Sequence, residues 1–293
     1  MANGAIAEEI RQRLGDCSPA ERKVGRVLLA GWPASGFETI ATLAERANVS
    51  APTVLRFVTR LGYRGFPDFQ SALRAELDER NASPLSLYES GTYTDESEAA
   101  AGPAGPAGLL RHGSEVFTNA VSRTLAELTP HDVERALHLL ADPKRRITLV
   151  GGRFTHLLAQ YLGLHLMQLR DDVRFLPDRP VERTAMLATL SRRDVLVIFD
   201  YRRYEDDKVT IAELLREQGG KVVLFTDTWL SPVAVHAEVV LPSQVGAPSP
   251  YDSLVPTLAV VETVVAGILT TLAEPGHRRM QVGEDTAKRL GLA

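Results

Sequence analysis

The chain has 293 residues, of which 44% are hydrophobic and 24% charged, and its net charge is -4. This length allows about two domains of 100–200 residues each, and the composition is that of a soluble globular protein. The sequence lacks both an uninterrupted apolar run of about 18 residues and a secretory leader, and its one cysteine, Cys17, excludes an intramolecular disulfide, so we expect a cytoplasmic protein with no membrane partner.

Positive charge is concentrated in one short part of this acidic chain. Between Arg46 and Arg74 the sequence has five arginines and a single acid, Asp68, a local excess of four positive charges. Such an excess is the electrostatic pattern of a nucleic-acid-binding segment.

Helical signals precede and include this basic segment. Ser18-Pro19-Ala20-Glu21 is a capping box with proline at the first helical position, which predicts a helix start. A second helix is expected after Thr39 and a third after Ser50, ending at Gly62, with Asn48 and Val49 in the turn between them. The apolar residues expected to face inward are Val24, Val27, Leu28, Ile40, Leu43, Ala44, Ala47, Val54, Phe57, Val58 and Leu61.

The third helix has the polar outer face of a DNA-reading helix. With its apolar residues buried, helical geometry places Thr53, Arg56 and Arg60 on one outward stripe. A major groove about 12 Å wide admits a single α-helix, which a preceding helix holds in place. We predict base contact by Arg56, because a guanidinium can donate two hydrogen bonds to guanine, and phosphate contact by Arg60, Tyr63 and Arg64. The full set of predicted DNA-binding residues is Ser50, Ala51, Thr53, Arg56, Arg60, Tyr63 and Arg64.

A solvated arginine face on a protein-interaction module is the alternative interpretation, and spacing alone does not exclude it. The string from Thr39 to Leu73, however, resembles the N-terminal domain of the RpiR family of bacterial sugar-responsive regulators. The Ser-x-x-Thr-Val-x-Arg-Phe core, the Leu-Gly-aromatic end and the Gly-Phe-x-x-Phe tail are here Ser50, Thr53, Val54, Arg56, Phe57, Leu61, Gly62, Tyr63, Gly65, Phe66 and Phe69. The resemblance covers about the first 77 residues and implies a transcription regulator that binds a double-stranded DNA operator.

A segment rich in Gly, Pro, Ala, Ser and acids separates this helical part from the rest. Residues 81–107 cannot bury enough apolar surface to order themselves, so we predict a flexible linker there. The predicted organisation is a helix-turn-helix DNA-binding domain over 1–80, this linker over 81–107, and a domain for effector binding and dimerisation over 108–293.

After the linker, helices over 109–141 are followed by alternating strands and helices. Short runs rich in β-branched residues predict strands at 147–151, 173–177, 194–200, 221–227 and 237–242. Because helix-length segments separate most of them, they predict a parallel sheet covered on both faces. The expected fold class is a two-domain α+β protein, with an all-α helix-turn-helix domain and an α/β parallel-sheet domain.

This order of elements resembles a sugar isomerase (SIS) domain over roughly 109–275, the usual partner of the RpiR DNA-binding domain. The resemblance implies a Gly-x-Gly-x-Ser loop after the first strand and a Ser-x-Ser-Gly loop after the third, with hydroxyl groups that hold a sugar phosphate. Here the loops are Gly151-Gly152-Arg153-Phe154-Thr155 and Asp200-Tyr201-Arg202-Arg203. Most of the hydroxyl groups are therefore replaced.

The loops after the first, third and fourth strands form the predicted effector site, because helix N-termini at that edge of a parallel sheet favour anions. Either the pocket is lost and the domain only dimerises, or Arg153, Arg202 and Arg203 are cationic forks for carboxylate or phosphate. We favour the second explanation, although Asp200 and the acids at 205–207 offer ion-pair partners. The predicted effector-binding residues are Gly151, Gly152, Arg153, Thr155, Asp200, Tyr201, Arg202, Arg203 and Thr226.

The loops offer little for catalysis. An isomerase needs a Glu or His base beside the sugar carbons, and near these loops only His156, His236, Glu182 and scattered acids occur. No set of His, Asp and Glu has metal-ligand spacing. We therefore predict no catalytic residue, no metal and no cofactor.

Residues 252–274 predict a helix that is apolar nearly all round and needs burial on two sides. We expect a subunit interface, in a homodimer or homotetramer, which would pair two recognition helices on half-sites about 34 Å apart. The preferred function is a transcription regulator that responds to a small anionic metabolite, either a sugar phosphate or a sugar acid. The alternatives are a sugar-phosphate isomerase-like enzyme and a DNA-bound dimerisation scaffold without ligand.

Overall fold

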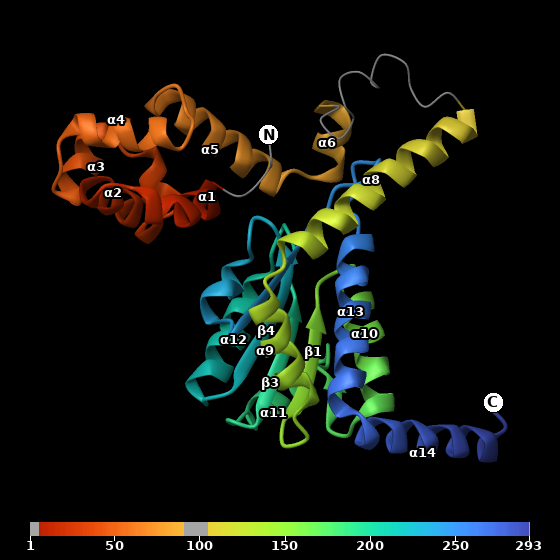
Figure 1. Ribbon diagram of the computed structural model, residues 1–293. Coiled ribbons are helices and arrows are strands. Elements are labelled where there is room, and N and C mark those ends of the chain that lie inside the picture. The colour runs from red at the N-terminus through yellow and green to blue at the C-terminus, as the bar shows by residue number, and fades with distance from the viewer. Residues whose placement is uncertain (1–5, 91–104, 293) are drawn as a thin grey trace. The chain divides into compact units, whose positions relative to one another are not determined.

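The computed structural model describes residues 6–90 and 105–292, and the chain divides after residue 82 into two compact units. The first unit is helical, as the sequence predicts (Figure 1). Its helices are α1 (Ile6–Arg13), α2 (Pro19–Ala30), α3 (Ile40–Ala47), α4 (Ala51–Arg60) and α5 (Phe66–Asn81), with 3-10 turns η1 (Leu14–Asp16) and η2 (Ala34–Phe37).

Three helices of this unit, α2, α3 and α4, pack against one another around one apolar core. The predicted capping box is present at the start of α2: the Ser18 N–H donates to Glu21 Oε2 at 2.8 Å, and the Glu21 N–H donates to Ser18 Oγ at 3.4 Å. Asn48 ends α3 in the left-handed conformation, with φ 49°, and so makes the predicted turn into α4. The predicted inward residues are buried, except Val27 and Ile40, which are partly buried.

The second unit contains a five-stranded, all-parallel sheet in the order β2-β1-β3-β4-β5. All five predicted strands are confirmed: β1 (Arg146–Gly151), β2 (Val173–Phe175), β3 (Asp194–Phe199), β4 (Lys221–Asp227) and β5 (Val239–Ser243). The helices are α6 (Pro84–Ser90), α8 (Gly105–Glu127), α9 (Pro130–Ala141), α10 (His156–Leu169), α11 (Pro180–Leu187), α12 (Asp206–Glu217), α13 (Val255–Leu272) and α14 (Glu274–Leu290), with a 3-10 turn η3 (Pro232–His236).

Helices cover both faces of the sheet, which confirms the layered α/β prediction (Figure 1). Alternate residues of β3 enter different cores: Val195, Val197 and Phe199 pack with α9, α10 and α13, whereas Leu196 and Ile198 pack with α12. Because all strands are parallel, their carboxyl ends share one edge, and the loops that follow β1, β3 and β4 meet there.

The segment predicted as a flexible linker is helical at both ends. Ser83 caps α6, because its Oγ accepts the Ser86 N–H at 3.1 Å, and Pro84 occupies the first helical position. At the other end, α8 begins at Gly105. Residues 91–104, the rest of the predicted linker, lie outside the described residues.

The predicted helix over 252–274 is present as α13. Within the described residues, α13 is the one helix long and apolar enough to cross a membrane by length and composition. It packs against α8, α9 and α10 and contributes to the core over the sheet, so it serves as a core helix of this unit.

Candidate functional site

The outward face of α4 is the first candidate surface, in the unit of residues 6–82. Its inward residues are Thr53, Val54, Phe57 and Val58. The period of the helix leaves the remaining side chains exposed, and these are Ala51, Pro52, Leu55, Arg56, Thr59 and Arg60.

Arg56 lies on this exposed face, but Thr53 does not. The Thr53 side chain is 4% exposed, so the expectation that it shares the outward stripe is wrong. Its hydroxyl forms a hydrogen bond with Ser50 Oγ at 3.0 Å and accepts one from Arg56 Nη2 at 3.2 Å. Thr53 therefore holds the start of α4 together and orients the Arg56 guanidinium, whose other N–H groups lack a carboxylate partner among the described residues.

Arg60 joins α4 to the start of α2. Its Nε lies 3.4 Å from Oε1 of the buried Glu21, and its Nη1 donates to the Asp16 carbonyl at 3.4 Å. Hydrogen bonds from Ser18, and then the Arg60 charge, lower the pKa of Glu21. About half of the Arg60 side chain stays exposed, 48%, so it braces the unit and still reaches solvent.

Tyr63 and Arg64, in the segment between α4 and α5, differ in exposure. The Arg64 side chain is 90% exposed and forms an ion pair with Asp68, at 3.2 Å from Nη2 to Oδ1, which lowers the pKa of that carboxyl. Tyr63 is partly buried, with its ring edge-on to Phe69 at 5.3 Å between centroids, and burial raises the pKa of its phenol. Arg64 thus extends from the surface, whereas most of Tyr63 belongs to the core.

A pocket of about 260 Å³ lies at the carboxyl edge of the sheet in the second unit. Three loops and Pro84 of α6 form it, and the loop residues are Gly152, Arg153, Phe154, Thr155, Asp200, Tyr201, Arg202, Arg203, Glu205, Tyr251, Asp252 and Leu254. The predicted loops after β1 and β3 therefore come together, and the loop before α13 is a third wall that the sequence did not indicate.

The loop after β1 is shaped by its glycine and threonine residues. A Cβ added to Gly151 would lie 2.4 Å from the His156 backbone nitrogen, so no larger residue fits there. The Thr155 hydroxyl accepts the Gly152 N–H at 2.8 Å and donates to the Phe199 carbonyl at 3.0 Å. Thr155 is buried by these bonds and closes the loop, while Arg153 and Phe154 remain exposed.

The first two residues after β3 turn inward. Asp200 is 2% exposed and accepts hydrogen bonds from the Ser231 hydroxyl and the Glu205 N–H, and burial raises the pKa of its carboxyl. The Tyr201 hydroxyl forms hydrogen bonds with Ser243 Oγ at 2.9 Å and Thr257 Oγ1 at 2.8 Å. Both side chains form the floor of the pocket, and their polar atoms are already paired with protein groups.

The prediction that Arg202 offers a free guanidinium to a ligand is wrong. Its side chain is 7% exposed and paired at both ends with Asp252, at 2.5 Å from Nη2 to Oδ1 and 2.8 Å from Nε to Oδ2. Its guanidinium also lies over the Trp229 ring, 5.7 Å from the centroid. A charge neutralised in this way organises the wall of the pocket, and is not available as a fork for a ligand.

The prediction that Thr226 belongs to the effector site is also wrong. It is fully buried, its hydroxyl accepts the Ser231 N–H at 3.0 Å, and it does not line the pocket. The next residue, Asp227, accepts hydrogen bonds from Tyr204 Oη at 2.6 Å and from the Arg202 N–H. Burial raises the pKa of Asp227 to about 6.

Two arginines of the pocket keep their positive charge uncompensated. Arg153 and Arg203 are both exposed, and no acid among the described residues forms an ion pair with either. Arg203 has φ 63°, the left-handed region that a non-glycine residue seldom adopts. Glu205, which also lines the pocket, is paired with the buried Lys208 ammonium.

Sequence reasoning missed several residues of this site. Phe154 and Tyr251, each 62% exposed, add aromatic surface to the pocket, and Asp252 supplies the partner of Arg202. Asp252 had a weak signal, since an acid just before a long helix often sits at the helix N-terminus. Its partner, 50 residues away in the chain, had no local signal.

Both units match known protein families. Residues 4–80 match the helix-turn-helix domain of the rpiR family, and residues 139–267 match the SIS domain. The HTH-type transcriptional regulator HexR of Pseudomonas aeruginosa is 27% identical over 271 residues, which cover 90% of this chain and 88% of HexR.

Solved structures agree with these matches. The sugar isomerase domain of an RpiR transcription factor from Sphaerobacter thermophilus is 26% identical with a TM-score of 0.54, over 58% of this chain and 97% of that domain. The Vibrio vulnificus NanR protein, in complex with ManNAc-6P, has the same fold over 97% of this chain and 98% of its own, with a TM-score of 0.54 and 17% identity.

Proposed function

Because the chain belongs to the RpiR family of helix-turn-helix transcription regulators with a SIS domain, we propose that α4 reads a double-stranded operator and that the loop pocket binds a small anionic, sugar-derived effector. In this proposal residues 1–80 bind DNA and residues 108–293 bind the effector and dimerise. The segment between them is a connector with helical ends in place of the fully flexible linker. Operator binding places the protein in the cytoplasm.

The observation that carries the effector proposal is the pair of uncompensated cations in the pocket. Arg202 is neutralised by Asp252 and Lys208 is paired with Glu205, which leaves Arg153 and Arg203 to attract an anion. The N-terminus of α10, which follows the loop containing Arg153, adds the positive end of the helix dipole. Phe154 and Tyr251 offer apolar surface for the carbon face of a sugar ring.

The nature of the effector follows from these groups and from one relative. Guanidinium groups suit phosphate and carboxylate equally well, so a sugar phosphate and a sugar acid are both compatible with the pocket. NanR, which shares the fold, is in complex with a sugar phosphate, ManNAc-6P. This supports testing phosphosugars first.

A thermal-shift screen tests the effector proposal. Hexose phosphates, sugar acids and dicarboxylates are each added, and a true effector at about 100 times its dissociation constant adds roughly 2.7 kcal/mol to the free energy of unfolding. The double variant Arg153→Ala/Arg203→Ala should lose this shift. The matched control Arg179→Ala/Arg289→Ala removes two exposed arginines outside the pocket and should keep it.

The outcomes of this screen separate the rival functions. A shift that survives in the pocket variant would move the effector site elsewhere. A wild-type protein that responds to no ligand would favour the dimerisation scaffold.

We also propose that the pocket binds without turnover. The exposed His156 lies with Nδ1 2.9 Å from the Arg153 carbonyl oxygen, and Glu205 is engaged by Lys208, so neither is set up as a free base for an isomerisation. Prolonged incubation with each binding phosphosugar, followed by NMR, should show no new sugar. A new isomer in the spectrum would make the protein an enzyme.

A homodimer completes the proposal, with an interface on the outer faces of α10 and α13. Leu157, Tyr161 and Leu164 follow one another on α10 at helical spacing and are 53%, 36% and 57% exposed. The Tyr161 hydroxyl donates to Glu262 Oε1 of α13 at 2.9 Å, which joins the two helices into one surface. Most apolar residues of α13 pack into the core of this unit, so α10 presents most of the exposed apolar surface of the proposed interface.

A further inference from the structure

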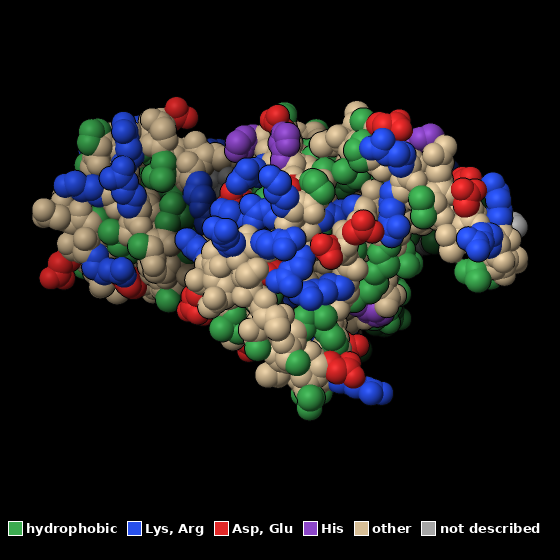
Figure 2. Space-filling model, turned by 90° about the horizontal axis from the view of Figure 1, so that it is seen from below, with side chains coloured by type: hydrophobic (Ala, Val, Ile, Leu, Met, Phe, Trp, Pro, Cys, Tyr) green, Lys and Arg blue, Asp and Glu red, His purple; other side chains and the backbone are tan. Residues whose placement is uncertain are grey.

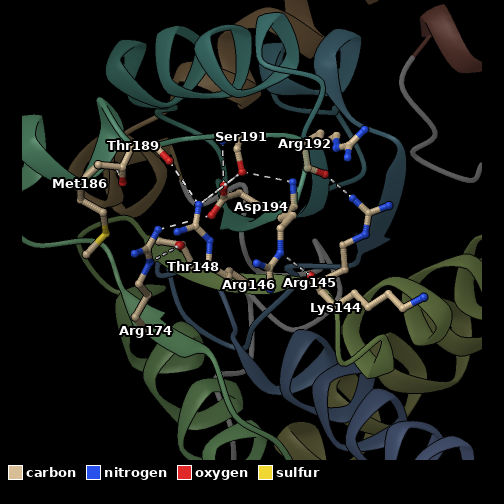
Figure 3. Close-up of polar contacts among 11 residues, drawn as sticks. Lys144, Arg145, Arg146, Thr148, Arg174, Met186, Thr189, Ser191, Arg192 and Asp194 are labelled. Carbon is tan, nitrogen blue, oxygen red and sulfur yellow. Dashed lines mark hydrogen bonds and ion pairs between the residues drawn. The ribbon is translucent and has the colours of Figure 1, made fainter.

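A second concentration of positive charge lies at the opposite edge of the sheet from the effector pocket. Six cationic side chains gather at the amino ends of β1 and β3 and on β2: Lys144, Arg145, Arg146, Arg174, Arg192 and Arg193 (Figure 3). We call this group the basic edge. Figure 2 shows Lys and Arg side chains crowded together at the centre of the face seen from below.

Hydrogen bonds to main-chain carbonyls hold the basic edge in place. Arg145 Nη1 donates to the Arg192 carbonyl at 2.5 Å, and Arg193 Nε donates to the Lys144 carbonyl at 3.1 Å. These bonds run between the loop before β1 and the loop before β3, so each loop fixes a guanidinium of the other (Figure 3). Carbonyl groups carry no net charge, so the arginines are positioned without being neutralised.

Carboxylates compensate only part of this charge. The buried Asp194 accepts from Arg146 Nη2 at 2.6 Å and lies 3.4 Å from Arg174 Nη2, and Asp142 lies 3.5 Å from Arg145 Nε. Asp142 and Asp194 against these six cations leave an excess of four positive charges, and the neighbouring Arg170, Asp171 and Asp172 reduce this excess to three.

Two cations of the basic edge are open to a partner. The Lys144 and Arg192 side chains are exposed and form no hydrogen bond or ion pair with the described residues. A hollow of about 390 Å³ lies beside them, with walls that also include Asp142, Arg145 and Arg193. The surface is therefore both charged and concave.

We propose that the basic edge binds the phosphate backbone of duplex DNA that flanks the operator, an inference that rests on the DNA-binding function proposed above. The cations cover three neighbouring strands, about 10 Å at the usual interstrand spacing, which suits a row of phosphates better than one small anion. Arginine predominates, and its planar fork matches phosphate oxygens. A protein already held on an operator by α4 meets the adjoining phosphates at high effective concentration.

The alternative partner of such a surface is an acidic protein. Duplex DNA is favoured because it is the polyanion that the proposed function already requires this chain to bind. Two copies of the basic edge would repel each other, so it does not serve as a self-complementary dimer interface.

The test compares two duplexes that carry the same operator, obtained by selection from randomised DNA. One duplex contains the operator alone, and the other extends it by about 30 base pairs on each side, roughly three helical turns. The full-length wild type and the variant Lys144→Ala/Arg192→Ala are titrated with both duplexes over a range of salt. The matched control Lys288→Ala/Arg289→Ala removes the same charge from the exposed end of α14.

The wild type should bind the extended duplex more tightly and with a steeper salt dependence. In Lys144→Ala/Arg192→Ala, the slope of log affinity against log salt should fall by about 1.8 on the extended duplex, at about 0.9 for each phosphate that the variant no longer neutralises, and stay unchanged on the operator alone. The control should match the wild type on both duplexes.

Three results would contradict this inference, and they differ in which statement they contradict. Equal slopes for the variant and the control on the extended duplex overturn it. Binding of polyglutamate that the variant loses, without any change on the extended duplex, assigns the basic edge to an acidic protein instead. Failure of the wild type to bind either duplex contradicts the proposed function itself, and is thus distinguishable from failure of this inference.

Discussion

The arginines on and after α4 have three different partners, and this decides which of them can read a base. Arg60 is braced by the buried Glu21, and Arg64 is paired with Asp68 on the surface. Arg56 bonds only to the neutral hydroxyl of Thr53 among the described residues. A new contact by Arg56 therefore breaks no ion pair, whereas Arg60 and Arg64 must share or exchange a carboxylate.

Replacement of Arg56 by alanine should relax sequence preference at one position of the operator, with a loss of roughly 1–3 kcal/mol of discrimination there. Arg64→Ala should instead weaken binding to all duplexes alike and lower the salt slope by about 0.9. Fluorescence anisotropy on the operator and on singly substituted duplexes measures both effects.

Thr53→Val, which keeps the shape of the side chain but removes the hydroxyl, should reproduce a fraction of the Arg56→Ala effect. Unchanged preferences in Arg56→Ala would remove α4 from the groove.

In the pocket, Arg202 and Arg203 are neighbours with opposite roles. Arg202→Met leaves Asp252 as an unpaired, largely buried carboxylate and should cost about 3–5 kcal/mol in the free energy of unfolding. Arg203→Met, at an exposed position, should change that free energy by about 0.5 kcal/mol or less. Urea unfolding of the two variants gives the comparison, and equal losses would contradict the buried pair.

Sequence reasoning at this scale succeeded where the signal was local. The exposure of Arg56 follows from helical period, and the Ser18 capping box from spacing along the chain. The burial of Tyr201 and the pairing of Arg202 depend on Ser243, Asp252 and Thr257, which lie 42 to 56 residues away. No local pattern encodes such contacts, and so the cationic fork was assigned to an arginine that is already neutralised.

At the scale of helices and strands, the prediction was much closer to the structure. Buried parallel strands are continuous apolar runs and their connecting helices are amphipathic, so all five strands and their order in the chain were predictable. Helix α6 was missed because a composition rich in Ser and Pro outweighed a short cap at Ser83. The order of strands across the sheet is set by tertiary packing and became clear only in the structure.

Disruption of the α10 face should dissociate the proposed dimer. Leu164→Glu places a charge in the exposed stripe of Leu157, Tyr161 and Leu164, where a partner would have to bury it. Light scattering after size exclusion should show a monomer. The control Val235→Glu alters a side chain that is 71% exposed on η3, away from this face, and should stay dimeric. A dimeric Leu164→Glu would rule out this interface.

For the whole molecule, the proposed effector site and the proposed operator site lie in separate units. Each ligand can influence the other only if the protein has two arrangements with different affinities. Neither arrangement need be rigid, since a shift in their populations is sufficient. The family relationship therefore predicts a coupling free energy between pocket and helix, and thermodynamics requires that this coupling be mutual.

If the effector changes the dissociation constant of the operator by a given factor, a saturating operator must change the dissociation constant of the effector by the same factor. A coupling of about 1–3 kcal/mol, or roughly 5- to 150-fold, is typical. Calorimetric titration of effector into free and operator-bound protein measures one side, and anisotropy measures the other. Unequal factors would show that the ligand acts through a second site or through assembly.

The hydroxyl groups of Tyr201, Ser243 and Thr257 tie the floor of the pocket to the first turn of α13. This helix has 18 residues and is thus a rod about 27 Å long. If the helix tilts by about 5° at the tied end, its far end moves by roughly 2 Å, because the displacement grows with the length of the helix. A small displacement of the pocket residues would in this way become a larger displacement at the proposed dimer interface.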